Sequence, residues 1–430
     1  MRARRKVPGM KPTALDQISY GDLYARWEKG NWRAMEIDFS EDKRHWDDVF
    51  SDVERRAALW NYAMFFHGED SVADNLSPYI DAAPREEQKY FLATQQADEA
   101  RHAVFFGRFM HEVVGVGDTV AGALEATRPE LTWGFRKVFE RLDRMADELR
   151  RDRSLPTLAA GITLYHLFVE AALAQPGQHF IERSLEQRDL LPGFRAGMAN
   201  VSLDEQRHIG FGVKMLSDLI AEDPDCRESS LALLREVLPY GLGLFVPPNW
   251  DRSYTECFGF TLEEIYAEGS QSLWTKLRTA GFSEEELTTS LRLPPDTTPE
   301  ERARRALTLL EAGILGEKTG PPRRDPEIMQ LFFDSLRLAV DPAAAPDGRP
   351  VTVQWDFADA QPWFLHIDNG ATRAEQGRAE TPDLTFRCRF EDFVDVAAPS
   401  SHRGCPPRAA SMRAGPSPPA WCPGAGAARW

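Results

Sequence analysis

Two pentapeptides of the chain agree at four of their five positions. They are Asp98-Glu-Ala-Arg-His102 and Asp204-Glu-Gln-Arg-His208. Residues three apart on a helix lie on the same face, so the glutamate and the histidine of each pentapeptide can bind one metal ion. A single Glu-x-x-His arises easily by chance in a helical protein, but its repetition with the flanking Asp and Arg is far more specific. We therefore expect Glu99, His102, Glu205 and His208 to be metal ligands rather than parts of solvated helix faces.

Two further glutamates extend the pattern. Glu69 lies 30 residues before Glu99, and Glu170 lies 35 residues before Glu205 in the most apolar stretch of the chain. The order Glu, Glu-x-x-His, Glu, Glu-x-x-His is a twofold internal repeat, and it is the ligand arrangement of ferritin-like dimetal carboxylate bundles. Four carboxylates neutralise two divalent ions, whereas four buried acids without metal would be costly. Oxygen and imidazole ligands suit iron or manganese. The alternative for Glu170 is a buried ion pair with an arginine.

Other polar side chains lie next to these ligands in the sequence. Asp98 and Asp204 suit a supporting role, because each can orient a ligating histidine across the bundle and fix its tautomer. Asp70 and His67 adjoin Glu69 and are alternatives to it as the first ligand. The remaining histidines and the many phenylalanines at helical spacing are expected to be core or surface residues.

The ligands must be positioned by long helices. From Glu41 to Ile220 the pattern is amphipathic and helical, broken by Pro and Gly at plausible helix ends. We expect helices over residues 42–76, 84–114, 131–151, 156–187 and 192–221, followed by weaker helical patterns over 226–317. The most apolar of these segments contains His166 and Glu170, and charge there is expensive in lipid. It is therefore expected to be a core helix rather than a membrane span.

The pattern changes in the last quarter of the chain. Residues 318–326 contain three prolines and a glycine and predict a linker. A helix is expected over 327–340, then strands over 351–357, 363–367 and 384–390, with a hairpin turn at Asn369-Gly370. The fold class predicted is mainly α, a ferritin-like helical bundle followed by a small α+β domain. The expected boundaries are an N-terminal extension (1–40), the bundle (41–280), a helical linker (281–325), the small α+β domain (326–396) and a disordered tail (397–430).

Composition limits the classes of partner. The chain has 430 residues, 42% apolar and 27% charged, as expected for a folded protein of two or three domains. Its net charge of −16 makes nucleic acid and anionic lipid surfaces unlikely partners on electrostatic grounds. The basic N-terminus is not followed by an apolar segment, so no signal peptide is predicted. Scattered cysteines without a Cys-x-x-Cys pair favour the reducing cytoplasm.

Over residues 40–280 the chain resembles the small, metal-containing subunit of class I ribonucleotide reductase. In that family the radical tyrosine lies one helical turn after the first ligating histidine, and here this position is Phe106. The last tyrosine in the chain is Tyr266, so the tyrosine-bearing tail that docks such subunits is also missing. A subunit that carries a tyrosyl radical is therefore disfavoured, although family members without that tyrosine exist.

A closer resemblance is to the ligand-binding oxidase branch of the same superfamily. Its members hold a manganese/iron pair and a long-chain fatty-acid-like ligand, and join a valine to a tyrosine by an ether cross-link. The valine lies three residues after the first Glu ligand and the tyrosine five residues before the third, which are Val72 and Tyr165 here. Helical geometry puts Val72 on the face of Glu69. Tyr165 lies about 140° from Glu170 on an ideal helix, so its role follows from the resemblance alone.

The resemblance implies an O₂-activating dimetal oxidase that contains Mn/Fe or Fe/Fe, binds a long-chain fatty-acid-like ligand and oxidises a C–H bond. A cytoplasmic homodimer with an unknown electron donor is expected. Residues 326–396 resemble part of a sterol-carrier-protein-type lipid-binding domain. The alternatives are a dimetal N-oxygenase or desaturase, a reductase small subunit without the radical tyrosine, and a lipid- or metal-binding protein without catalysis. Val72 and Tyr165 distinguish the oxidase branch from the first of these.

Overall fold

The computed structural model describes residues 18–294, 297–340, 349–368 and 371–398. Of these described residues, those up to Glu286, with Thr298–Ala303, form one compact unit, and those of Leu287–Thr297 and from Arg304 to residue 398 form a second. The first unit is helical, and the second contains a small sheet. The predicted class, a helical bundle followed by a small α+β unit, is therefore confirmed.

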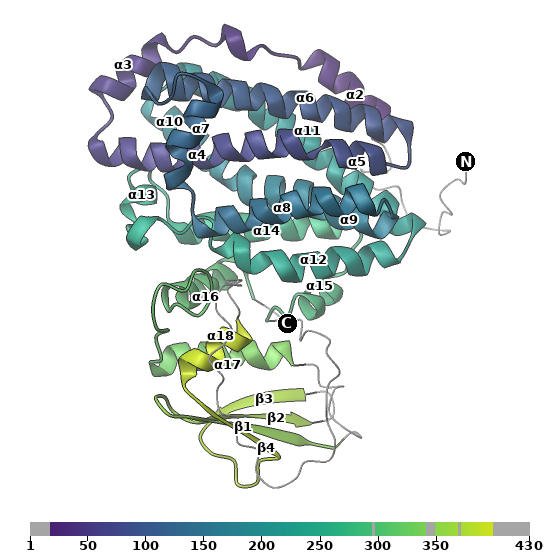
Figure 1. Cartoon of the computed structure of the whole chain (residues 1–430), viewed down its shortest axis with the longest axis vertical. Helices are drawn as coiled ribbons and strands as arrows, with labels where there is room; N and C mark the ends of the chain where they lie inside the picture. Colours follow the sequence, from purple (N-terminus) through teal and green to yellow (C-terminus); the bar gives the residue numbers. More distant parts are fainter. Residues whose placement is uncertain (1–17, 295–296, 341–348, 369–370, 399–430) are drawn as a thin grey trace. The chain divides into compact units, whose positions relative to one another are not determined.

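The first unit is a bundle of long helices that run side by side (Figure 1). Helix α4 packs on α6, and the π-helical segment η4 packs on α11 and α14. The helices of this unit, in chain order, are α2 (Tyr20–Lys29), η1 (Ala34–Glu36), α3 (Ser40–Asp48), α4 (Asp52–Asn75), α5 (Ser77–Ala82), α6 (Glu86–Phe109), η2 (Met110–Val114), α7 (Val120–Thr127), η3 (Arg128–Glu130), α8 (Trp133–Arg151), α9 (Leu155–Ile162), η4 (Thr163–Ala174), α10 (Gln175–Arg188), α11 (Pro192–Glu222), α12 (Asp225–Leu242), η5 (Pro248–Trp250), α13 (Ser253–Glu256) and α14 (Leu262–Ala280).

The continuous helix Leu155–Arg188, formed by α9, η4 and α10, lies in the core of the bundle. It is long and apolar enough to cross a membrane by length and composition, but most of its apolar stretch is buried inside the protein. Ser154 caps its start, accepting a hydrogen bond from the backbone of Thr157, and Pro156 occupies the first turn, where no backbone donor is needed. The structure thus agrees with the expectation of a core helix.

Two features near the N-terminus differ from the sequence prediction. The helix expected over 42–76 is split into α3 and α4, because Ser51 starts a new helix with a capping box. Glu54 N donates to Ser51 Oγ, and Ser51 N donates to Glu54 Oε2 over 2.7 Å. Residues expected to form a separate extension include α2 and η1, and Tyr20 OH donates to Asp218 Oδ2 of α11 over 2.8 Å. This segment therefore belongs to the bundle.

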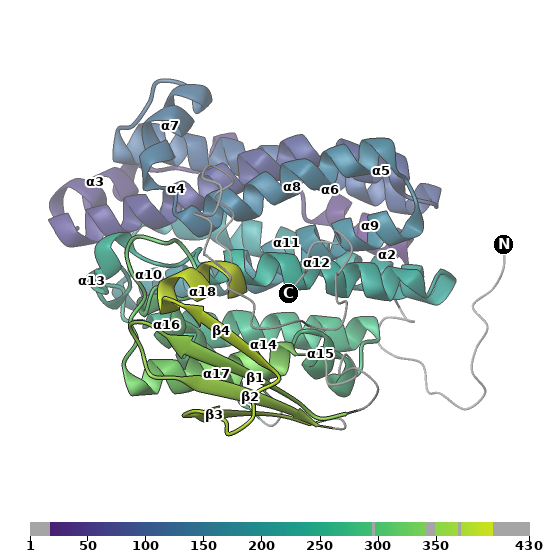
Figure 2. The same cartoon turned by 60° about the horizontal axis from the view of Figure 1, so that its bottom comes forward.

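The second unit has a four-stranded sheet in the order β3-β2-β1-β4 (Figure 1 and Figure 2). Its strands are β1 (Val351–Phe357), β2 (Trp363–Asp368), β3 (Ala371–Gln376) and β4 (Leu384–Cys388), and its sheet-covering helices are α17 (Pro326–Ala339) and α18 (Phe390–Ala397). Strand β1 is antiparallel to β2 and parallel to β4. Phe332 of α17 contacts Phe390 of α18, so both helices cover one face of the sheet. The predicted turn at Asn369-Gly370 and nearly all of the predicted disordered tail, from residue 399, lie outside the described residues.

The expected helical linker 281–325 does not separate the two units. It contains α15 (Glu284–Ser290) and α16 (Pro299–Glu311), and residues of both units fall within it. Leu309 and Ile314 share a buried core with Phe333 of α17. Arg323 N also donates to Ala312 O over 2.8 Å. The core of the second unit therefore starts before the predicted boundary at residue 326.

Candidate metal centre

The six predicted ligands come together in the middle of the bundle. All six are buried and come from four segments, α4, α6, η4 and α11. Their ligand atoms form two groups, each with all atoms within 4.8 Å of one another: Glu69, Glu99, His102 and Glu205; and Glu99, Glu170, Glu205 and His208. Two glutamates belong to both groups and are therefore suited to bridge two metal ions.

The two histidines have the same orientation toward the cluster. His102 Nδ1 lies 3.4 Å from Glu99 Oε2, and its Nε2 lies 3.2 Å from Asp204 Oδ2. His208 Nδ1 lies 3.3 Å from Glu99 Oε1, and its Nε2 lies 3.1 Å from Asp98 Oδ2. Each histidine thus presents Nδ1 to the carboxylates and Nε2 to the aspartate of the other pentapeptide. An aspartate in this place fixes the tautomer and leaves Nδ1 free for a metal.

The arginines of the two pentapeptides neutralise those aspartates. Arg207 donates to Asp98 and, over 2.9 Å, to Asp204. Arg101 also donates to Asp98 and, over 3.0 Å, to Asp204. Two buried negative charges are therefore matched by two positive charges, as burial of ions requires. This accounts for the repetition of Asp and Arg in the two pentapeptides.

Two tryptophans that were not predicted from the sequence complete the aspartate network. Trp27 Nε1 donates to Asp98 Oδ1 over 2.9 Å, and Trp32 Nε1 donates to Asp204 Oδ2 over 2.8 Å. Both tryptophans lie in the segment that was expected to be an extension. Their contacts depend on how that segment folds over α6 and α11, which no local pattern reveals.

The charge distribution of the cluster fits two divalent ions. Burial, with the nearby Glu205 and Glu99, raises the pKa of Glu170 well above its usual range. Burial also raises the pKa of Glu69 to about 8, despite the nearby His102. Buried ligand atoms on Glu170 (Oε2), Glu205 (Oε2) and His208 (Nδ1) have no hydrogen-bond partner among the described residues. Such orphaned atoms are costly without a cation, and carboxylate oxygens with imidazole nitrogens are the donors that iron and manganese accept.

Tyr165 reaches the cluster because its helix is not an ideal α-helix. Thr163–Ala174 is π-helical, with a wider turn in which residues five apart lie nearly above one another. The calculation of about 140° between Tyr165 and Glu170 assumed 3.6 residues per turn and does not apply here. The hydroxyl of Tyr165 donates to Glu99 Oε1 over 2.9 Å. Val72 is buried and lines the same pocket as Glu69.

The alternatives to Glu69 lie outside the cluster. His67 Nε2 lies 3.1 Å from the hydroxyl of Thr127, and Asp70 is only partly buried. At the position of the reductase radical tyrosine, Phe106 is fully buried and its ring stacks on Phe65. The structure therefore brings Glu69 to the cluster and leaves no oxidisable phenol at position 106.

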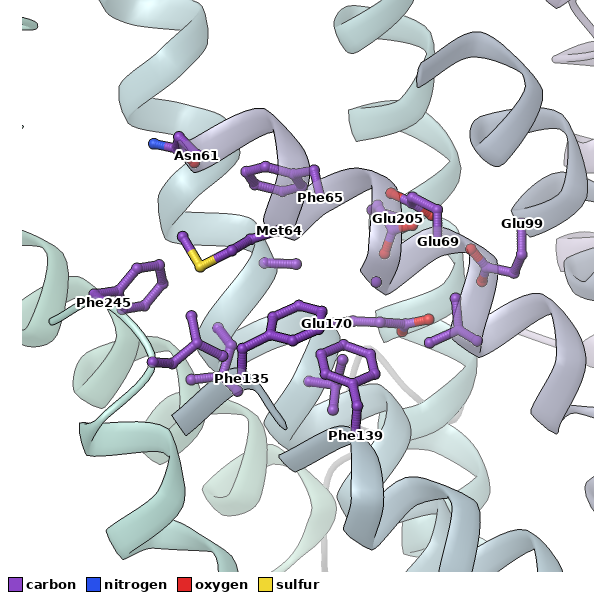
Figure 3. Close-up of a pocket in the computed structure, with 16 residues that line it drawn as sticks. Asn61, Met64, Phe65, Glu69, Glu99, Phe135, Phe139, Glu170, Glu205 and Phe245 are labelled. Carbon is purple, nitrogen blue, oxygen red and sulfur yellow. The ribbon is translucent and has the colours of Figure 1, made fainter. Parts of the chain in front are cut away.

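An apolar pocket ends at the four glutamates. Figure 3 shows Glu69, Glu99, Glu170 and Glu205 at one end, and Asn61 and Phe245 at the other. The wall between them is made of aliphatic and aromatic side chains, which include Met64, Phe65, Phe135, Phe139, Val169 and Leu173. Apolar walls with a few polar groups at one end are typical of sites for small apolar molecules.

The fold and the cluster define a dimetal carboxylate bundle, and comparison with known proteins gives the family. Residues 14–238, more than half of the chain, match the family "Ribonucleotide reductase, small chain". The chain therefore belongs to the ribonucleotide reductase small chain family.

Solved structures of R2-like ligand-binding oxidases share this fold. The oxidase from Sulfolobus acidocaldarius is 24% identical, with 66% of this chain and 93% of that chain covered and a TM-score of 0.52. An R2-like ligand-binding oxidase with an aerobically reconstituted Mn/Fe cofactor is 22% identical, with 60% and 92% covered and a TM-score of 0.52. A single-residue variant with an anaerobically reconstituted Mn/Fe cofactor is 23% identical, with 61% and 94% covered and a TM-score of 0.52. The resemblance in fold that the sequence predicted is confirmed.

Proposed function

We propose that this chain is an O₂-activating dimetal oxidase that binds a long-chain, fatty-acid-like ligand and oxidises it at a C–H bond. The observation that carries the proposal is the apolar pocket that ends at four glutamates. The names of the similar structures, oxidases with Mn/Fe cofactors, support it. The proposed ligands of the Mn/Fe or Fe/Fe pair are the two groups of carboxylates and histidines described above.

In this proposal the bound, reduced metal pair supplies electrons to O₂, and the protein controls access and geometry. The apolar walls exclude water and hold the ligand's chain next to the glutamates. Asp98 and Asp204 keep both histidines turned toward the metals. Tyr165 holds one oxygen of Glu99 through its hydroxyl group.

The same proposal includes an ether bond between Tyr165 and Val72. The phenol loses its O–H hydrogen and the valine loses a C–H hydrogen, which together release two protons and two electrons. Two metal ions held by the carboxylates and histidines of the cluster would supply two more electrons, so that one O₂ would be reduced to two waters with two further protons from solvent. The burial of Val72 in the pocket and the hydrogen bond from Tyr165 to Glu99 support this step.

A reconstitution experiment tests the function. Metal-free protein would be loaded anaerobically with Mn(II) and Fe(II), exposed to O₂, and analysed for O₂ consumption and for extracted ligand by mass spectrometry. Leu173→Trp, which fills the pocket, should abolish ligand binding but retain the metals, whereas the control Leu203→Trp on the exposed side of α11 should behave like wild type. O₂ consumption without an ether bond would favour an N-oxygenase, a desaturase or a reductase subunit. No O₂ consumption would favour a binding protein.

We also propose a cytoplasmic homodimer whose second unit binds lipid in the manner of a sterol-carrier domain. The cysteines in the described part of the chain, Cys226, Cys257 and Cys388, are free, as in a reducing compartment. A second pocket lies in this unit and is lined by apolar side chains such as Met329 and Trp363 and by polar ones such as Arg324, Asp359 and Gln361. Analytical ultracentrifugation tests the dimer, and fluorescent fatty-acid binding to wild type and Met329→Trp tests the pocket.

A further inference from the structure

Gln95 lies between two of the proposed metal ligands. It is on α6, one turn before Glu99, and is completely buried. Its Nε2 donates to Glu170 Oε1 over 2.8 Å and to Glu99 Oε1 over 3.2 Å. Carboxylates that bind a metal are ionised and only accept hydrogen bonds, so in the metal-loaded protein the NH₂ end of the amide must face them. The other end, Gln95 Oε1, lies 3.0 Å from His166 Nε2. His166 must therefore carry its proton on Nε2 and donate it to Gln95.

His166 is itself firmly held. Its ring lies 4.8 Å from the ring of Tyr165 and 5.7 Å from that of Phe211, measured between centroids. A Cβ atom on Gly212 would lie 2.2 Å from His166 Cβ, so the glycine on α11 makes room for the imidazole. Burial, with a smaller effect of the nearby His208, lowers the pKa of His166 to about 3, which keeps the ring neutral at physiological pH.

This arrangement allows only one orientation of the Gln95 amide. A rotation by half a turn would direct its oxygen at the oxygens of Glu99 and Glu170. Those buried contacts would then pair acceptors with acceptors, which costs the desolvation of those groups. The glutamates thus determine which end of Gln95 faces them, and His166 supplies a hydrogen-bond donor to the oxygen at the other end.

We propose that Gln95 and His166 are a positioning pair that holds Glu170 Oε1 and leaves Glu170 Oε2 to bind a single metal ion. Glu170 Oε2 has no hydrogen-bond partner among the described residues, whereas Glu170 Oε1 has Gln95. The inference rests on the proposed metal centre. It predicts that the pair supports the metal held by Glu99, Glu170, Glu205 and His208 more than the one held by Glu69, Glu99, His102 and Glu205. Gln95 reaches the second group only through the shared Glu99, over 3.2 Å.

Titration of the metal-free protein with Mn(II) tests the pair. The electron paramagnetic resonance signal of free Mn(II) reports how many ions bind and how tightly. Gln95→Leu should lower the affinity for one of the two Mn(II) ions about 10- to 100-fold. This is the range for loss of a residue that supports a metal ligand. His166→Phe should weaken binding of the same ion, because the buried Gln95 Oε1 then loses its donor and the amide is held less firmly. His166→Gln retains an N–H donor at a similar reach and should restore the affinity.

The double variant separates positioning from general packing. If His166 acts through Gln95, adding His166→Phe to the Gln95→Leu protein should not lower the Mn(II) affinity further. If the two substitutions only disturbed packing independently, their effects on the affinity would add. Circular dichroism checks that each variant is folded. If wild type binds two Mn(II) ions and the variants bind both ions as tightly as wild type, the inference is wrong but the metal centre stands. The same holds if the variants lose both ions to the same extent. Wild type that binds no Mn(II) would overturn the proposed metal centre, and the inference with it.

Discussion

Arg207 gives the most direct test of the buried charge network. Its side chain is 7% exposed and donates to both Asp98 and Asp204, which are themselves almost fully buried. Replacement by methionine keeps much of the volume but removes one positive charge from a balanced set of four. Breaking a buried ion pair by removing one partner costs about 3 to 5 kcal/mol, because the other charge stays buried.

The expected loss lies at the lower end of that range. Asp98 and Asp204 retain Arg101 and the two tryptophan donors, so we expect Arg207→Met to cost about 3 kcal/mol. For a domain of this size each kcal/mol lowers the melting temperature by about 2 to 4 °C, so the shift should be roughly 6 to 12 °C. Thermal unfolding followed by far-ultraviolet circular dichroism would measure it.

A surface pair provides the matched control. Arg150 and Asp147 on α8 have the same spacing of three residues and a distance of 2.7 Å, but both side chains are more than half exposed. Exposed pairs contribute about 0 to 1 kcal/mol, so Arg150→Met should barely change the melting temperature. Equal effects of the two substitutions would refute the argument that burial makes the Arg207 network important.

Two further predictions concern the cluster. In wild type, mass spectrometry should find the Val72 and Tyr165 peptides linked and lighter by two hydrogens than their sum. Tyr165→Phe should abolish this cross-link while both metals remain bound. Separate, unmodified peptides in aerobically assembled wild type would count against the oxidase branch. In metal-free protein, burial raises the pKa of Glu69 from 4.5 to about 8, and Glu99 raises that of His208 from 6.5 to about 10 against the effect of burial. The folded protein then holds protons that the unfolded chain has lost, so the melting temperature of metal-free protein should fall between pH 6 and pH 8. Metal-loaded protein should show a smaller fall, and an equal fall would contradict protonated ligands in the metal-free cluster.

Helical spacing was enough to predict Glu99, His102, Glu205 and His208, and the ferritin-like ligand order added Glu69 and Glu170. Glu and His at a spacing of three share a helix face, and the repeated pentapeptides pointed to two equivalent halves. The split between α3 and α4 was also visible in principle, because Ser51 and Glu54 form the sequence signature of a capping box. The roles of Trp27 and Trp32 were not predictable, since they depend on the folding of an N-terminal segment over distant helices.

The contacts of Tyr165 and Gln95 show a second limit. Periodicity assumes 3.6 residues per turn, and the π-helical turns of η4 change which side chains share a face. Gln95 precedes Glu99 by one turn, so its place on the ligand face was predictable, but its bond to His166 of another helix was not. Pairing between helices is set by the whole fold rather than by local sequence.

The central claim is that the cluster holds two metal ions, and metal analysis of the purified protein tests it most directly. Iron and manganese counted separately should sum to about two ions per chain. Glu170→Ala and His208→Ala should each lower that number while the protein stays helical, whereas the control Glu186→Ala, at an exposed position of α10, should keep both ions. Wild type without metal, or full loading in both ligand variants, would contradict the claim.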